Sequence, residues 1–253
     1  MSSVNIVLRR ARRIFVVIAV IVLLAVVAFL FYSSMVMAGD RSQAIKVWDN
    51  PAITVTSTDH SVVLEPTGAA SGSGLVFIPG AKVDPYAYMY KLSGIVESSG
   101  VTVVITKPTL NLAFFDQRPL SLFEDDAPAV SRWFVGGHSL GGVRACQLAA
   151  SPGAEVAGLV LFGSFCANDL STSTLEVLSI GGNADGLSTP VKIDNASTLL
   201  PAGAAIVQID GLNHAGFGDY GSQPGDGAAT LSSEQERSAI TDLLESVLAS
   251  GVH

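Results

Sequence analysis

The feature that most constrains the fold of this chain is the alternation of short, continuous apolar runs with stretches of helical pattern. Such runs occupy residues 74–79, 101–106, 133–137, 158–162, 177–180 and 205–209, and each is typical of a strand buried on both faces. Helices are expected over about 85–99, 120–132, 140–150 and 232–249, and a hairpin over 53–64. The alternation predicts an α/β domain, with a mainly parallel sheet and helices on both faces.

An uncharged segment covers residues 14–38, and its first part, IFVVIAVIVLLAVVAFLFY, is almost wholly apolar. A helix of this length, at about 1.5 Å per residue, spans the hydrocarbon layer of a membrane. Four arginines precede it and favour a cytoplasmic N-terminus: Arg9, Arg10, Arg12 and Arg13. We therefore expect a basic cytoplasmic segment (1–13), a single transmembrane signal anchor (14–38), a linker (39–52) and an extracytoplasmic domain (53–253).

A cleaved signal peptide is the alternative for this segment. Val36 and Ala38 place small residues at positions −3 and −1 of a possible cleavage site before Gly39. The apolar stretch is longer than the roughly 7–15 residues usual in signal peptides, which favours the anchor. Both alternatives export the domain, and cleavage would make it a secreted protein.

The charge balance argues against nucleic acid as a partner. The whole chain has a net charge of −8. Once the four N-terminal arginines are set aside, 10 basic residues face 22 acidic ones, so the rest of the chain carries about −12. A domain this acidic repels phosphate backbones. Apolar residues make up 49% of the chain and charged residues only 14%, which excludes wholesale disorder.

The segment most informative about chemistry is GHSLG, residues 137–141, which matches G-x-S-x-G. It follows the strand predicted over 133–137 and opens the helix predicted over 140–150. In this context the serine sits in a sharp, strained strand-to-helix turn, and small neighbours let the chain pass closely. The turn exposes the hydroxyl at the positive end of a helix. The pattern therefore predicts Ser139 as a nucleophile.

A serine nucleophile needs a base, and the chain has four histidines. His138 belongs to the elbow and should point away from the serine, His60 lies in the early hairpin, and His253 is the last residue. His214 follows the strand predicted over 205–209, at the carboxyl edge of the sheet. His214 is therefore the predicted base.

The base needs an acid that orients it, supplied from a strand end between serine and histidine. Asp185 fits, because it lies in the loop after the strand predicted over 177–180. The resulting order of serine, aspartate and histidine is the one expected for this architecture. Asp169, after the preceding strand, is the alternative acid.

An oxyanion also needs hydrogen-bond donors. One is the backbone N–H of Leu140, which follows the nucleophile. The other is expected in the loop after the strand predicted over 74–79, where we choose the backbone N–H of Ala81. No CxxC pair or Cys/His cluster has metal-ligand spacing, and the triad chemistry implies neither a metal nor an organic cofactor.

From about residue 74 onward the chain resembles the α/β-hydrolase superfamily, most closely the small single-domain group related to dienelactone hydrolases. The motifs that carry the resemblance are FIPGA (77–81), GHSLGG (137–142), GNADG (182–186) and GLNHAGF (211–217). Dienelactone hydrolases have a cysteine nucleophile where this chain has Ser139, so their substrate is not carried over. Only residues 163–174 separate two predicted strands where many family members insert a cap domain, so no cap is expected.

Together these features predict a serine hydrolase that cleaves a small-molecule ester through an acyl-enzyme. A thioester or an amide is a secondary possibility. The alternative from another class is a catalytically inactive α/β-hydrolase domain that serves as a binding module at the cell surface. The sequence names neither the acyl group nor any protein partner.

Cys146 and Cys166 are predicted to be free thiols. Cys146 lies two helical turns beyond Ser139, which places it about 10 Å below the carboxyl edge of the sheet. Cys166 follows the strand predicted over 158–162 and should lie at or above that edge. A disulfide requires Cα atoms within about 7 Å of each other. A loop that folds back over the helix would bring them together, and this disulfide is the open alternative.

Overall fold

The computed structural model describes residues 3–249, and the chain divides into two units, Met1–Met35 and Val36–His253. The first unit is a single helix, α1 (Ser3–Ser34). Its stretch Val7–Ser34 is long and apolar enough to cross a membrane, and the most apolar part of the stretch is unburied. A signal sequence near the N-terminus has the same properties. His253, one of the histidines considered above, lies outside the described residues.

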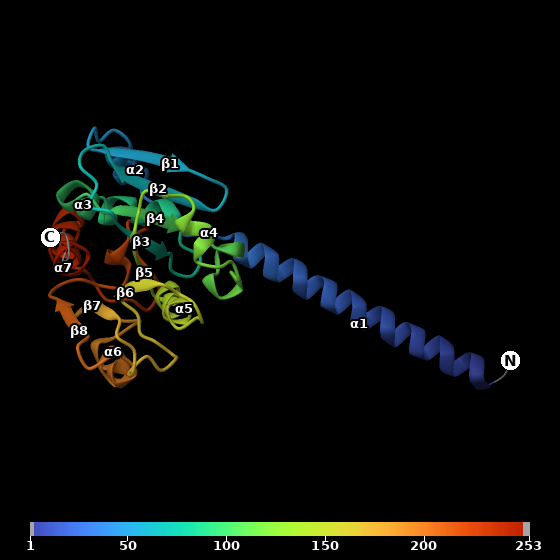
Figure 1. The fold of residues 1–253 in the computed structure, drawn as a ribbon. Helices are drawn as coiled ribbons and strands as arrows, with labels where there is room; N and C mark the ends of the chain where they lie inside the picture. Colours follow the sequence, from blue (N-terminus) through green and yellow to red (C-terminus); the bar gives the residue numbers. More distant parts are fainter. Residues whose placement is uncertain (1–2, 250–253) are drawn as a thin grey trace. The chain divides into compact units, whose positions relative to one another are not determined.

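The second unit contains an eight-stranded sheet in the order β1-β2-β4-β3-β5-β6-β7-β8 within the described residues. The strands are β1 (Ile53–Ser57), β2 (Ser61–Pro66), β3 (Ser73–Ile78), β4 (Thr102–Thr106), β5 (Arg132–His138), β6 (Val156–Phe162), β7 (Glu176–Gly182) and β8 (Ala205–Ile209). β1 and β2 form the predicted hairpin, and β2 is also antiparallel to β4. β4, β3 and β5 to β8 run parallel, which confirms the predicted mainly parallel sheet (Figure 1).

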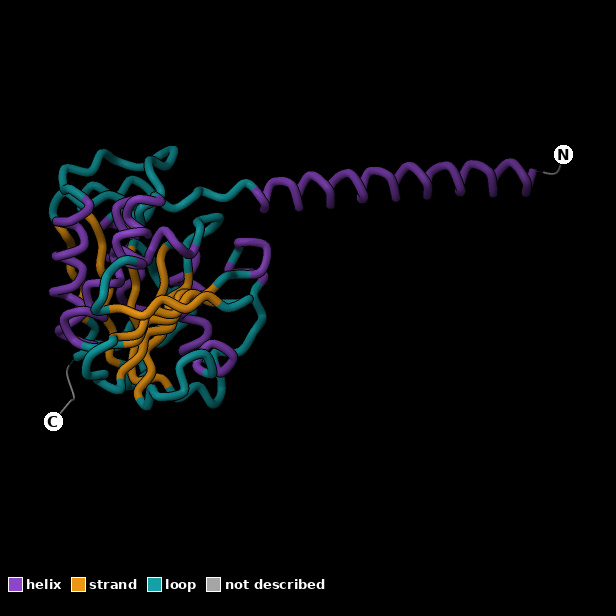
Figure 2. The backbone as a smooth tube through the Cα atoms, turned by 90° about the horizontal axis from the view of Figure 1, so that it is seen from above, coloured by secondary structure: helices purple, strands orange, loops and turns teal. Residues whose placement is uncertain are grey.

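Helices cover both faces of this twisted sheet (Figure 2). α2 (Arg41–Trp48), α3 (Met89–Ser99) and α7 (Ser233–Leu248) bury apolar side chains against one face, and α4 (Ser121–Glu124) and α5 (Leu140–Ala149) do so against the other. α6 (Pro190–Ala196) packs near β7. Five short 3-10 helices complete the described residues: η1 (Pro85–Tyr88), η2 (Thr109–Asn111), η3 (Ala113–Phe115), η4 (Ser197–Leu199) and η5 (Ala215–Phe217). Alternate residues of the strands point to the two faces, and each face has its own apolar core.

The helix predicted over 85–99 begins and ends where the sequence indicates. The Asp84 side chain accepts a hydrogen bond from the Tyr86 N–H and caps η1, which continues directly into α3. Gly100 ends α3 in the left-handed conformation, with φ of 65°. The last helix is likewise capped as expected, because Ser232 and Gln235 form a capping box at the start of α7.

The prediction of a helix over 120–132 is wrong, because only α4 (Ser121–Glu124) is helical in this range. Pro128 lacks an N–H group and disfavours the helical conformation of the residue before it. Arg132 already belongs to β5, where it pairs with Ser73. A turn and a strand therefore replace the predicted helix.

The linker expected over 39–52 contains α2 instead of a free connection. Asp40 caps this helix through a hydrogen bond from the Ser42 N–H to its carboxylate. Val47 of α2 is 1% exposed and belongs to the same apolar core as α3. The segment is therefore part of the folded unit. The sequence did not indicate this, because many residues of the segment are polar.

The prediction of free thiols is also wrong, because Cys146 and Cys166 form a disulfide with a Cα–Cα distance of 5.6 Å. After β6 the chain turns at Gly163, whose φ is 47°, and folds back beside α5. The Asn168 side-chain amide donates a hydrogen bond to the Cys146 carbonyl, at 3.3 Å. The expectation failed because it placed Cys166 at the sheet edge and not on a returning loop. This loop has no helix, so the β6–β7 connection carries no cap domain, as predicted.

Candidate active site

Ser139 occupies the turn between β5 and α5, with φ of 52° and ψ of −121°. A residue other than glycine rarely adopts this backbone conformation unless its surroundings impose it. A Cβ atom on Gly141 would lie 2.0 Å from the Ile78 carbonyl oxygen, and one on Gly137 would lie 2.5 Å from the Gly141 carbonyl carbon. Both glycines of the motif are therefore needed for the turn to pack against β3.

Neighbouring backbone and side chains hold this turn in place. The Ser139 N–H donates to the Phe162 carbonyl at 3.0 Å, and the Ser164 hydroxyl donates to the Ser139 carbonyl at 2.7 Å. A Cβ atom on Gly142 would lie 2.4 Å from Ser164 Oγ, so the second glycine after the serine makes room for this bond. The end of β6 thus fixes the strained turn.

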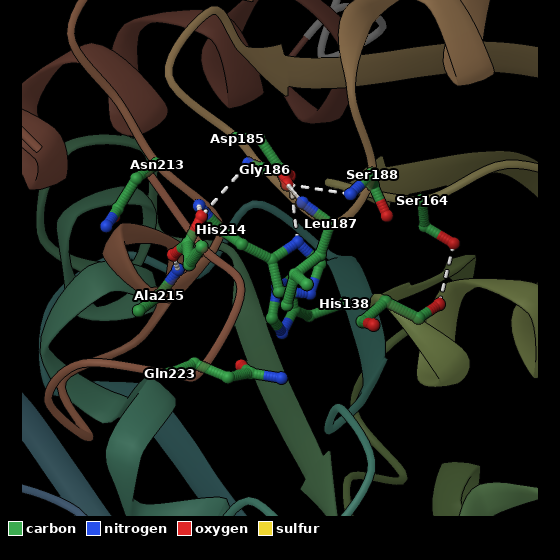
Figure 3. A network of polar contacts seen from close by, with 12 residues as sticks. His138, Ser164, Asp185, Gly186, Leu187, Ser188, Asn213, His214, Ala215 and Gln223 are labelled. Carbon is green, nitrogen blue, oxygen red and sulfur yellow. Dashed lines mark hydrogen bonds and ion pairs between the residues drawn. The ribbon is translucent and has the colours of Figure 1, made fainter. Parts of the chain in front are cut away.

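Asp185 and His214 form a buried pair at the carboxyl edge of the sheet (Figure 3). His214 Nδ1 lies 2.8 Å from Asp185 Oδ2, and the two residues are 1% and 3% exposed. Asp185 Oδ1 accepts hydrogen bonds from the N–H groups of Leu187 and Ser188, at 2.8 and 2.7 Å. One carboxylate oxygen therefore holds the loop after β7, and the other is left to orient the imidazole ring.

Asp226 joins the loops that carry these two residues. Its Oδ1 accepts from the N–H groups of His214 and Gly186, at 3.0 and 3.1 Å, and its Oδ2 accepts from the Ala215 N–H at 2.8 Å. The sequence analysis missed Asp226, because it lies in a glycine-rich loop where an aspartate usually serves only the turn. The glycines on both sides of it, Gly225 and Gly227, are the only local signal.

Asp169 and His60, which were also considered as acid and base, have their polar partners elsewhere. Asp169 is exposed, and its carboxylate accepts from the Ser171 N–H at 2.9 Å. His60 pairs with Asp126, with 3.3 Å between Nε2 and Oδ1. Within residues 3–249, the carboxylate hydrogen-bonded to the His214 ring is that of Asp185.

The serine turn and the His214 loop are adjacent. His138, which precedes Ser139, has its ring centroid 4.4 Å from that of His214. Among the described residues, no hydrogen bond joins the Ser139 hydroxyl to His214. In substrate-free active sites this bond is commonly long and tightens when the substrate binds.

His138 connects the serine turn to the loop after β3. Its Nδ1 lies 2.9 Å from the Tyr88 hydroxyl, which accepts a hydrogen bond from the Gly80 N–H at 2.9 Å. Burial raises the pKa of Tyr88 well above its usual value, so the phenol keeps its proton in its hydrogen bond with His138 Nδ1. Burial, and then the charge of His214, hold the pKa of His138 well below its usual value. His138 is therefore neutral, and its buried Nε2 has no hydrogen-bond partner within the described residues.

The two backbone groups expected to bind an oxyanion lie at the start of α5 and in the loop after β3. Within residues 3–249, neither the Leu140 N–H nor the Ala81 N–H donates to another backbone group. The next residue, Lys82, is left-handed with φ of 58°, and its N–H donates to the Asn111 carbonyl at 2.7 Å. The loop that carries Ala81 is thus held from the loop after β4.

Across the part of the chain that the structure describes, no group of three or more His, Cys, Asp or Glu side chains is arranged to hold a metal ion.

Comparison with known proteins agrees with the observed fold. A family model described as "Alpha/beta hydrolase family" matches residues 74–238. No protein with a curated description matches the sequence.

Solved structures share the fold. An esterase domain from Rhodothermus marinus superposes with a TM-score of 0.58 at 14% identity, over 79% of this chain and 99% of its own. A carboxyl esterase from the fungus Tuber melanosporum gives 0.56 at 13% identity, over 84% and 91%. A dienelactone hydrolase from Anabaena variabilis gives 0.53 at 14% identity, over 78% and 99%. At these identities the likeness concerns the fold alone.

Proposed function

The chain belongs to the alpha/beta hydrolase family, and on this premise we propose that it is a serine hydrolase that cleaves an ester through an acyl-enzyme. The observation that carries the proposal is the buried bond of 2.8 Å between Asp185 and His214, at the sheet edge where Ser139 occupies its strained turn. A base oriented by a buried acid beside a half-buried serine in a strand-to-helix turn is the arrangement that nucleophilic catalysis requires.

The proposed reaction begins with attack of Ser139 Oγ on the ester carbonyl carbon, while His214 Nε2 takes the serine proton. Asp185 keeps the other proton on Nδ1 and stabilises the imidazolium ion that forms. The Leu140 and Ala81 N–H groups hold the oxyanion of the tetrahedral intermediate. The intermediate collapses as His214 returns the proton to the departing alcohol. Water then repeats the sequence on the acyl-enzyme, which releases the carboxylic acid and the free serine.

The likeness to esterases in fold favours a small-molecule substrate, and without a cap between β6 and β7 this substrate would enter from the loops at the carboxyl edge. An ester is proposed ahead of an amide because its alkoxide leaving group departs more readily than an amine, and a thioester is kept as a secondary possibility. A catalytically inactive binding domain is the alternative. The complete Asp185–His214 pair speaks against it, since binding alone does not need an oriented base.

The test is hydrolysis of a small activated ester by the full-length protein in detergent. Ser139→Ala and His214→Ala should each lower the rate by roughly 10³-fold or more. Ser171→Ala and His60→Ala are the matched controls, and they should retain the wild-type rate. A wild-type protein that hydrolyses none of a panel of esters, thioesters and amides would support the binding-domain alternative.

We further propose that α1 anchors the protein and that the hydrolase unit lies on the extracytoplasmic side. The apolar stretch Val7–Ser34 and the arginines at its start support this orientation. The Cys146–Cys166 disulfide supports it independently, because disulfides persist in oxidising compartments. Protease treatment of intact cells should remove the hydrolase unit. A released protein that begins at Gly39 would instead identify a cleaved signal peptide.

A further inference from the structure

The short segment 37–40, here called the N-terminal strap, is hydrogen-bonded into the hydrolase unit. The Met37 N–H donates to the Lys82 carbonyl at 2.7 Å, and the Asp84 N–H donates to the Met37 carbonyl at 3.0 Å. These two bonds form an isolated parallel bridge between Met37 and Val83. The Asp40 N–H donates to the Asp219 carbonyl at 2.6 Å. The strap therefore contacts two loops that are far apart in the sequence.

The first of these loops carries the proposed oxyanion donor Ala81. Lys82, the next residue, is left-handed, a conformation that a residue with a side chain keeps only when its surroundings impose it. Its N–H is bound to the Asn111 carbonyl and its carbonyl to the Met37 N–H. The strap thus supplies one of the two backbone bonds that hold this residue from opposite sides.

The second loop carries the proposed base His214 and continues to Asp219. The Asp219 N–H donates to the Ala87 carbonyl at 2.7 Å, and its carboxylate accepts from the buried Lys91 ammonium group at 2.8 Å. Asp219 is therefore held in place through both its backbone and its side chain. The hydrogen bond from the Asp40 N–H to the Asp219 carbonyl attaches the strap to this residue.

The backbone of the strap packs closely against η1. A Cβ atom on Gly39 would lie 2.8 Å from the Ala87 backbone nitrogen and 3.0 Å from its Cα. Met37 packs against the apolar core that includes Val83, which is 3% exposed. Close packing and backbone bonds together fix the strap in one position.

We propose that Met37 and Asp40 are positioning residues, whose backbone bonds hold the Ala81 loop and the His214 loop in the arrangement that catalysis needs. This inference rests on the proposed function. It has a consequence for processing: cleavage before Gly39 would remove Met37 and with it the bridge to Val83. The form that keeps its N-terminal segment is therefore the fully active one.

The proposal is tested in the full-length protein in detergent with Met37→Pro, which removes the N–H that binds the Lys82 carbonyl. Val36→Pro is the matched control, because the Val36 N–H has no backbone partner among the described residues. Met37→Pro should lower kcat roughly 10- to 100-fold with little change in KM, since misplaced donors weaken the transition state more than substrate binding. Val36→Pro should keep the wild-type kcat.

Hydrogen–deuterium exchange supplies a readout that does not need activity. In Met37→Pro the amides of residues 82–84 should exchange faster than in wild type, while peptides from β5 and β6 keep their protection. If wild type hydrolyses no ester, the proposed function fails, and the exchange data still decide whether the strap holds the loop.

A second pair of variants decides the matter if Met37→Pro does not fold. Gly39→Ala places a methyl group against the Ala87 backbone, whereas Gly68→Ala has no atom within 4 Å of the added carbon. Gly39→Ala should show the same loss of kcat and of protection, and Gly68→Ala should match wild type. A strap variant with wild-type kcat and wild-type exchange at 82–84 would overturn the proposal.

Discussion

His214 Nδ1 and Asp185 Oδ2 lie 2.8 Å apart in a site where both side chains are almost completely buried. The bond fixes the ring tautomer, because a proton on Nδ1 leaves Nε2 as the basic nitrogen. The two backbone N–H groups on Asp185 Oδ1 keep the carboxylate from rotating. The pair is therefore preorganised before any substrate arrives.

Replacing this acid should be far more damaging than replacing the alternative one. Asp185→Asn should lower kcat by about 10³- to 10⁴-fold, because an amide favours the wrong ring tautomer. Asp169→Asn should leave kcat unchanged, since Asp169 is exposed and bound only to its own turn. Steady-state hydrolysis of an activated ester by both variants makes the comparison. The reverse ranking would assign the acid role to Asp169.

Tyr88 should matter for catalysis although it takes part in no step of the proposed reaction. Tyr88→Phe leaves the Gly80 N–H and His138 Nδ1 without their buried partner, which should destabilise the fold by about 1–3 kcal/mol. The loop that carries Ala81 should also shift, lowering kcat by roughly 10-fold or more with little change in KM. Thermal unfolding and steady-state kinetics measure the two effects.

Tyr90→Phe is the control for this prediction, because no hydrogen bond to the Tyr90 hydroxyl is present among the described residues. It should match wild type in both measurements. Equal behaviour of the two phenylalanine variants would show that the contact from Tyr88 to Gly80 does not position the loop.

Much of this site could be predicted from the sequence, because its residues lie in the loops that directly follow predicted strands. Parallel strands bring their carboxyl ends to one edge, so the loops of Asp185 and His214 meet there although 29 residues separate them. The contact between Tyr88 and His138 spans 50 residues and depends on how two side chains pack, which no local pattern encodes. The return of the loop to Cys146 and the docking of α2 depend on tertiary packing in the same way.

The disulfide should contribute to stability. Closing a loop with a sequence separation of 20 is worth about 3 kcal/mol in the chain-entropy description. The double variant Cys146→Ser, Cys166→Ser should therefore unfold at a lower temperature than wild type, and reductant should lower the unfolding temperature of wild type only. Thiol titration of the denatured, unreduced protein should find no reactive thiol. Two reactive thiols would contradict the observed pairing.

The central claim is that Ser139 is an activated nucleophile, and labelling with a fluorophosphonate probe tests it most directly. Mass spectrometry of the labelled full-length protein, followed by peptide mapping, identifies the modified residue. We expect a single adduct on Ser139 that is absent in Ser139→Ala and forms much more slowly in His214→Ala. Folded wild-type protein that takes up no probe, or that carries the adduct on another serine, would contradict the account.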